Sequence, residues 1–88
     1  MAGLTVSVVS ADQEIWSGVA TMVVARTTEG EIGILAGHEP MLAILASGEV
    51  RLTVDNGPSV TARAEDGFLS VEHDTVTIVA RNAELVRP

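Results

Sequence analysis

Apolar and polar residues alternate with a period of two along most of the chain. In the segment 4–8, leucine and valine alternate with threonine and serine, and similar short apolar-polar segments follow at 50–54, 59–64, 68–71 and 75–80. This period is typical of strands that bury one face. No segment keeps a helical period over the ten or so residues that a helix prediction requires. The pattern therefore predicts an all-β protein.

Turn-forming residues separate the predicted strands. They occur at ADQE (11–14), Asn56-Gly57-Pro58, Glu65-Asp66-Gly67 and Glu72-His73-Asp74. Asn, Asp and Gly tolerate the backbone angles that tight turns need, so these clusters predict reversals of the chain. Short strands at regular spacing with polar turns indicate a β-sandwich or a flattened barrel whose two sheets turn their valine and leucine faces inward.

The length and the composition set the size and the content of the core. A chain of 88 residues is expected to form one domain, residues 1–88, with a thin interior. Hydrophobic residues make up 47% of the chain, yet Phe68 and Trp16 are its only aromatic residues. Aliphatic side chains must therefore fill the interior, and valine and isoleucine favour strands.

The charge excludes several classes of partner. The net charge is −7, with five arginines and no lysine, so the chain lacks the basic surface that nucleic acids and anionic lipids attract. No apolar run approaches the roughly 18 residues of a membrane span, and MAGLTV has no signal-peptide pattern. We therefore expect a soluble, intracellular protein that neither binds nucleic acid nor inserts into a membrane. The absence of cysteine excludes disulfides and thiolate metal sites.

Two histidine-acid pairs, His38-Glu39 and His73-Asp74, are the only candidates for a metal site. A cupin-like metalloprotein needs several imidazoles and a carboxylate around one cavity, and the His-x-His signature of that class is absent. No serine lies in a Gly-x-Ser-x-Gly motif, and there is no cysteine nucleophile. We expect no catalytic residue, metal or other cofactor, and a cupin-like metalloprotein remains the least favoured alternative.

The stretch EGEIGILAGHEP, residues 29–40, concentrates loop-forming residues. Gly30, Gly33 and Gly37 permit positive φ or close backbone approach, and Pro40 removes an amide donor. These residues predict a compact, rigid loop in which Gly33→Val is strongly destabilising. A rigid loop that carries apolar and charged groups without a nucleophile favours recognition over catalysis. The residues alone thus indicate a β-sandwich that binds another protein, and an unrelated binding module of this kind is one alternative.

Four motifs make the chain resemble the β-sandwich domain of the epsilon subunit of F-type ATP synthases. The specific one is EGEIGILAGHEPMLAIL, which is similar to the family pattern Glu-Gly-x-x-Gly-hydrophobic-x-Pro-x-His-x-Pro followed by leucines. The other three motifs occur in the family order and are VVSADQEIWSG, SGEVRLTV and DGFLSV. The resemblance therefore covers nearly the whole chain, and the motif sequences are closest to those of actinobacterial members. The sequence departs from the family at Ala36, where proline is usual, and at Asp66, where glycine is usual.

The resemblance implies a flattened ten-stranded sandwich and a non-catalytic rotor subunit that couples proton translocation to ATP synthesis. Such a subunit binds the gamma subunit and the c-ring at the cytoplasmic face of the plasma membrane, and the isolated domain is expected to be a monomer. By matching position, the c-ring interface comprises Glu31, Gly33 and His38. The gamma interface comprises Ser10, Ala11, Asp12, His38, Met41, Leu42 and Leu45.

The resemblance also includes one large departure, which is length. Family members continue after the sandwich into two C-terminal helices that inhibit ATP hydrolysis and in some species bind ATP. The present sequence stops at Arg87-Pro88, where that helical hairpin begins in the family. Inhibition and nucleotide binding are therefore not expected of this chain.

Overall fold

The computed structural model describes residues 3–11, 13–46, 48–54 and 59–86. Within these ranges it contains eight strands and no helix. The strands are β1 (Leu4–Ser10), β2 (Gln13–Ala20), β3 (Met22–Thr27), β4 (Gly30–Leu35), β5 (Met41–Ile44), β6 (Gly48–Thr53), β7 (Val60–Glu72) and β8 (Thr75–Val86). The prediction of an all-β chain is confirmed.

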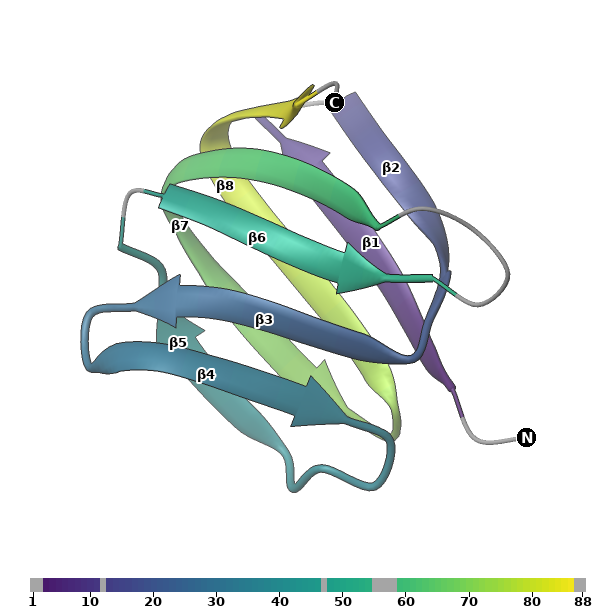
Figure 1. Cartoon of the computed structure of the whole chain (residues 1–88). Coiled ribbons are helices and arrows are strands. Elements are labelled where there is room, and N and C mark those ends of the chain that lie inside the picture. Colours follow the sequence, from purple (N-terminus) through teal and green to yellow (C-terminus); the bar gives the residue numbers. More distant parts are fainter. Residues whose placement is uncertain (1–2, 12, 47, 55–58, 87–88) are drawn as a thin grey trace.

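The strands form one continuous sheet that folds over on itself into two layers. The order is β2-β1-β8-β7-β6-β3-β4, and β5 pairs with β7 off this path. Figure 1 shows β3, β4 and β6 in one layer, with β5 and β1 in the layer behind. All neighbouring strands are antiparallel except β1 and β8, which run parallel. The predicted sandwich is therefore correct, and one of its strand pairs, β1 with β8, is parallel.

β7 and β8 contribute to both layers, because these two long strands bend at the corner where the layers join. On β7, the buried positions are Ala62 and Ala64 before the corner but Leu69 and Val71 after it. The inward-facing side of the strand thus changes from even to odd positions near Asp66. The described residues form eight strands, so the count of ten that the resemblance implied is not found, and β7 pairs in both layers through its two halves.

The core between the layers contains only aliphatic side chains. Its largest fully buried members come from β1, β3, β4, β6, β7 and β8: Leu4, Val6, Val8, Val23, Ile34, Leu52, Leu69, Val71, Val76 and Ile78. The alternation predicted for the first strand is confirmed there, since Leu4, Val6 and Val8 are buried. Neither aromatic residue is fully buried: Trp16 packs against the rim of the core, and Phe68 is 45% exposed.

The corner of β7 depends on two consecutive residues. Asp66 has a φ of 57°, in the left-handed region, and Gly67 follows it against the backbone of β8. A Cβ on Gly67 would overlap the Val79 carbonyl oxygen and would lie 2.5 Å from the Ala80 Cα. The prediction of a turn at Glu65–Gly67 was wrong. The chain changes direction there without leaving the sheet, because Asp66 adopts the left-handed angle while the pairing with β8 continues on both sides.

Asp66→Gly should stabilise the protein by about 0.5 kcal/mol. A left-handed conformation costs an L-residue about 1–2 kcal/mol, less for Asp, whereas glycine adopts it freely and loses part of that gain through its larger entropy in the unfolded chain. The measurement is urea unfolding followed by the fluorescence of Trp16, the only tryptophan. Asp66→Ala, which keeps the angle unfavourable, should be less stable than the wild type. A lower stability for Asp66→Gly would contradict the conformational argument.

The stretch 29–40 contains a strand as well as a loop, which corrects the sequence prediction. Residues 30–35 form β4, which pairs regularly with β3, and only Glu29 and residues 36–40 of the stretch lie outside strands. Gly30 and Gly37 have φ of 119° and 87°, as expected for glycines that permit positive φ. Gly33 is extended, and no atom lies within 4 Å of where its Cβ would be. The expectation that Gly33→Val is strongly destabilising was therefore wrong.

The turn predicted near residue 73 is confirmed as a tight connection between β7 and β8. Glu72 pairs with Thr75, which leaves His73 and Asp74 as the two connecting residues. Both have left-handed φ, of 50° and 58°. Two consecutive left-handed residues form the type of hairpin turn that matches the twist of the flanking strands. The turn predicted at residues 56–58 lies outside the described residues.

Candidate interaction surfaces

The outer face of the layer formed by β5, β7, β8, β1 and β2 carries a row of apolar side chains. Ile44 lies opposite Phe68, Phe68 opposite Val79, and Val79 opposite Val9. Directly opposed residues in a sheet point to the same side, so these four side chains form a row across four strands. Ile44 is 63% exposed and Leu42, two residues earlier on β5, is 72% exposed. The row is an apolar strip that the protein leaves open.

A second row of small hydroxyl side chains lies beside the first. Ser70 is opposite Thr77, Thr77 opposite Ser7, and Ser7 opposite Ser17. None of the residues in the two rows is charged, although the chain contains 12 acidic residues and five arginines. We call the two rows, together with Leu42, the neutral face. Charged residues border it, with Glu14 opposite Val9 on β2 and Glu72 two residues after Ser70 on β7. An exposed apolar strip of this kind is typical of a surface that another protein covers.

The outer face of the other layer is charged. Glu31 lies opposite Arg26, Glu49 opposite Arg63, and Arg63 opposite Glu84. All five side chains are exposed, so such pairs contribute little to stability. Acidic and basic groups alternate across the strands, which gives this face a surface suited to solvent. The contrast with the neutral face is therefore one of charge distribution between two sides of the same sandwich.

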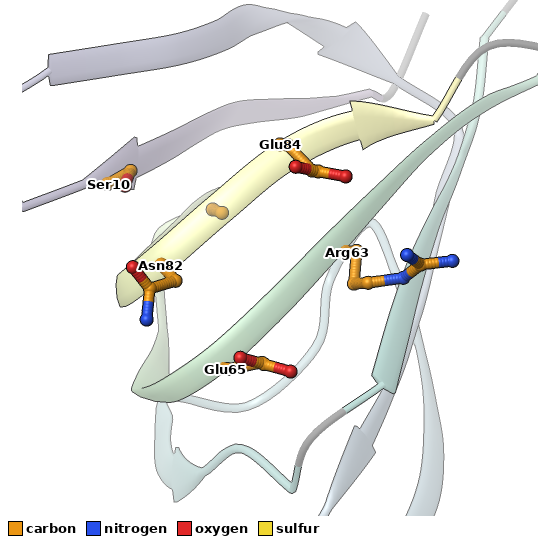
Figure 2. A pocket seen from close by; sticks show the side chains of 6 residues that line it. Ser10, Arg63, Glu65, Asn82 and Glu84 are labelled. Atoms are coloured by element: carbon orange, nitrogen blue, oxygen red, sulfur yellow. The ribbon is translucent and has the colours of Figure 1, made fainter.

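Two hollows are lined mainly by charged and polar residues. The larger, of about 310 Å³, is lined by Ser10, Arg63, Glu65, Asn82, Ala83 and Glu84. Figure 2 shows the Arg63 side chain extending away from Ser10 and Asn82. The described part of the chain contains no group of three or more His, Asp or Glu side chains placed to hold a metal ion.

The loop 36–40 is tied to the turn between β7 and β8. The Gly37 N–H donates a hydrogen bond of 2.7 Å to Oδ1 of Asp74, and the Asp74 carbonyl oxygen accepts one of 2.8 Å from the Thr5 N–H. His38 is half-buried, and its Nδ1 lies 2.7 Å from the Glu39 carbonyl oxygen. The loop, the hairpin turn and the start of β1 thus meet at one end of the sandwich.

The residues predicted for a c-ring interface do not lie in one loop. Glu31 and Gly33 belong to β4, whereas His38 lies in the loop after it. At about 3.3 Å per strand residue, Glu31 is about 13 Å from the end of β4 at which His38 follows. Glu31 and Gly33 nevertheless lie on β4, which is an edge strand of the sheet, and His38 lies in the loop that follows it.

Of the residues predicted for a gamma interface, Leu42 has its side chain on the neutral face. Ser10 ends β1 and Ala11 follows it, whereas His38 lies in the loop 36–40. Met41 is half-buried against the core. Leu45 is only 5% exposed, because it alternates with Ile44 and points inward, so its side chain is not available on the surface. Asp12 lies outside the described residues.

The sequence analysis missed Ile44, Phe68, Val79 and Val9. The alternation within MLAIL, residues 41–45, could have placed Ile44 on the same side as Leu42. The other three could not have been found locally, because the row appears only when the register of four strands is known.

Comparison with known proteins identifies the fold and its family. The family model for the ATP synthase Delta/Epsilon chain, beta-sandwich domain, matches residues 3–86. The ATP synthase epsilon chain of Micrococcus luteus is 55% identical over 85 residues, which are 97% of this chain and 93% of that one. The corresponding chain of Streptomyces coelicolor is 46% identical over 84 residues, 96% of this chain and 68% of its own length.

A solved structure has the same architecture. A chain in the Euglena gracilis mitochondrial ATP synthase structure, described as OSCP/F1/c-ring, superposes with a TM-score of 0.89 at 28% identity. The match covers 97% of the present chain and 54% of the Euglena chain, so the present chain spans about half the length of that relative.

These matches define a β-sandwich of the kind found in ATP synthases. The chain belongs to the ATP synthase Delta/Epsilon chain beta-sandwich domain family. Its curated relatives include actinobacterial proteins, as the motif sequences predicted. Nowhere in the described residues is there a helix with the length and apolar character that a membrane crossing would require.

Proposed function

We propose that the chain is a non-catalytic rotor subunit of an F-type ATP synthase, which links the gamma subunit to the c-ring and so couples proton translocation to ATP synthesis. The match along residues 3–86 and the 55% identity to an ATP synthase epsilon chain support this assignment. The Euglena relative comes from a structure of F1 with the c-ring, which supports the same two partners. As part of this proposal, the chain works at the cytoplasmic face of the plasma membrane within the assembled complex.

The neutral face is the proposed docking surface for gamma. The single observation that carries this part is an exposed, uncharged strip in a chain of net charge −7, centred on Ile44 and Phe68. Ser10, Ala11 and Leu42 border or belong to it, and Met41 supports it from below. The Leu45 side chain is left out of the proposal because it is buried.

The c-ring is proposed to bind along β4 and the loop 36–40. Glu31 and Gly33 are exposed on β4, and His38 lies in the loop that follows. β4 lies in the layer opposite the neutral face, and the loop 36–40 leads into β5, which carries Leu42 and Ile44 of that face, so the two proposed surfaces adjoin at this loop. The arrangement is what a connecting subunit requires.

Size-exclusion chromatography of the chain with its cognate gamma subunit tests the proposed function. The two proteins should elute together as a complex, and the isolated chain should elute as a monomer. An unrelated β-sandwich binding module would leave gamma unbound. Failure of the two to co-elute would therefore remove the main support for the rotor assignment.

His38→Ala should weaken attachment to a reconstituted complex of gamma and the c-ring without unfolding the domain. The one side-chain hydrogen bond of His38 in the structure is to its own neighbour, so its loss should change the free energy of unfolding by about 0.5 kcal/mol or less. Thermal melting and binding measure the two effects separately. His73→Asn, which removes the other histidine and tolerates the turn geometry, should leave binding unchanged. A large fall in melting temperature with normal binding of the folded fraction would make His38 a structural residue.

A further inference from the structure

The loop 36–40 has few hydrogen bonds to hold its shape. His38 N–H donates to the Leu35 carbonyl oxygen at 3.2 Å, and this bond is local. Pro40 has no N–H to donate. Among the hydrogen bonds of the described residues, the Gly37 N–H bond to the Asp74 carboxylate is the one that joins this loop to a distant part of the chain, 37 residues away. Between its two ends on β4 and β5, the loop is therefore tied to the rest of the domain by one side chain from another hairpin.

Asp74 is well suited to hold that loop. Its φ of 58° is an angle that Asp, Asn and Gly adopt at low cost, so the turn itself does not require a carboxylate. Its backbone carbonyl oxygen is bonded to Thr5 N–H, which fixes the residue against the start of β1. A charged acceptor at 2.7 Å from an amide nitrogen makes a short, strong hydrogen bond. Asp74 is thus anchored on one side and presents its carboxylate to the loop on the other.

We propose that Asp74 is a positioning residue for the loop 36–40, and that it fixes the orientation in which His38 meets the c-ring. The proposal rests on the function proposed above, because it takes the loop as part of the c-ring interface. It adds the β7–β8 turn to the determinants of attachment, although the turn itself touches no partner in this scheme. Asp74 acts only through Gly37, so its effect must disappear when the loop no longer contributes to binding.

Two substitutions separate the carboxylate from the turn geometry. Asp74→Gly removes the acceptor while glycine keeps the left-handed angle, and Asp74→Asn keeps both an acceptor oxygen and a residue that tolerates the angle. Hydrogen exchange of the Gly37 amide, followed by NMR on the 88-residue chain, reports the hydrogen bond directly. We expect at least tenfold faster exchange in Asp74→Gly and less than threefold in Asp74→Asn.

Binding of the same variants to a reconstituted complex of gamma and the c-ring tests the consequence. Asp74→Gly should weaken binding about five- to tenfold, Asp74→Asn less than twofold, and thermal melting should separate both from simple unfolding. His38→Ala should weaken binding less in the Asp74→Gly background than in the wild type, which a merely structural role of Asp74 does not predict.

The outcomes distinguish this proposal from the rotor assignment. If the wild-type chain does not bind the complex, the proposed function fails. If the wild type binds and Asp74→Gly binds equally well, only the role of Asp74 fails. Additive effects of His38→Ala and Asp74→Gly, or equal losses for the Gly and Asn variants, would also overturn the positioning role.

Discussion

Replacing Gly67 by alanine is expected to remove more than half of the domain's free energy of unfolding. The new Cβ would overlap the Val79 carbonyl oxygen and lie 2.5 Å from the Ala80 Cα, and both are backbone atoms of a paired strand that cannot rotate away. Relief requires β7 and β8 to separate at the corner where both layers join. Overpacking of this kind costs at least about 3 kcal/mol, which is a large part of the 5 kcal/mol or so available to a small domain.

Urea unfolding monitored by Trp16 fluorescence and by circular dichroism measures this effect. Gly33→Ala is the matched control, because Gly33 also lies in a strand but has no atom within 4 Å of the new Cβ. The control should unfold within about 0.5 kcal/mol of the wild type. If Gly67→Ala and Gly33→Ala unfolded at the same urea concentration, the close passage of β8 over Gly67 would be wrong.

Ile44→Glu is expected to abolish measurable binding to gamma while leaving the fold intact. Ile44 is 63% exposed in the isolated chain, so glutamate meets water there and stability should change by less than about 1 kcal/mol. In the proposed complex the same side chain would be covered by gamma and its charge would lose water without gaining a partner. We expect a loss of at least about 100-fold in affinity, equivalent to about 2.8 kcal/mol.

Thr53→Glu provides the control for the added charge. Thr53 is exposed on β6, in the layer whose outer face is charged, so its substitution should leave gamma binding unchanged. Isothermal titration with gamma, together with melting curves of both variants, makes the comparison. Normal binding by Ile44→Glu would exclude the neutral face as the gamma surface, and a loss with Thr53→Glu alone would move the interface to the other layer.

The alternation of apolar and polar residues was enough to predict strands that keep one side towards the core along their whole length. The segment 4–8 alternates because one side of β1 faces the core throughout, and Leu4, Val6 and Val8 are buried as predicted. The same logic failed at residues 65–67. An acidic pair followed by glycine has turn chemistry, and only the continuous pairing of β7 with β8 shows that the residues form a corner within a strand.

Properties that depend on register could not be predicted from the sequence. The glycines of the stretch 29–40 favoured a loop, but pairing with β3 makes residues 30–35 a strand. The neutral face combines residues from β1, β2, β5, β7 and β8, so it cannot be recognised in any single segment of the sequence. The family resemblance located Leu42 by position, yet it also selected Leu45, which directly follows β5 and is buried because it continues the alternation of that strand.

The strands that turn the corner have a mechanical consequence for a subunit held by two partners. Because β7 and β8 are continuous through both layers, a force applied to the neutral face reaches β6, β3 and β4 along covalent backbone and ladder hydrogen bonds. Sliding one layer over the other would require the β7–β8 hairpin to shear near Gly67. The layers are also joined where the end of β3 meets the end of β5, through the Thr27–Leu45 bridge and the hydrogen bond from the Thr28 N–H to the Ile44 carbonyl oxygen. Stiffness against twisting therefore resides in these two junctions, and the aliphatic core between the layers does not have to carry the load alone.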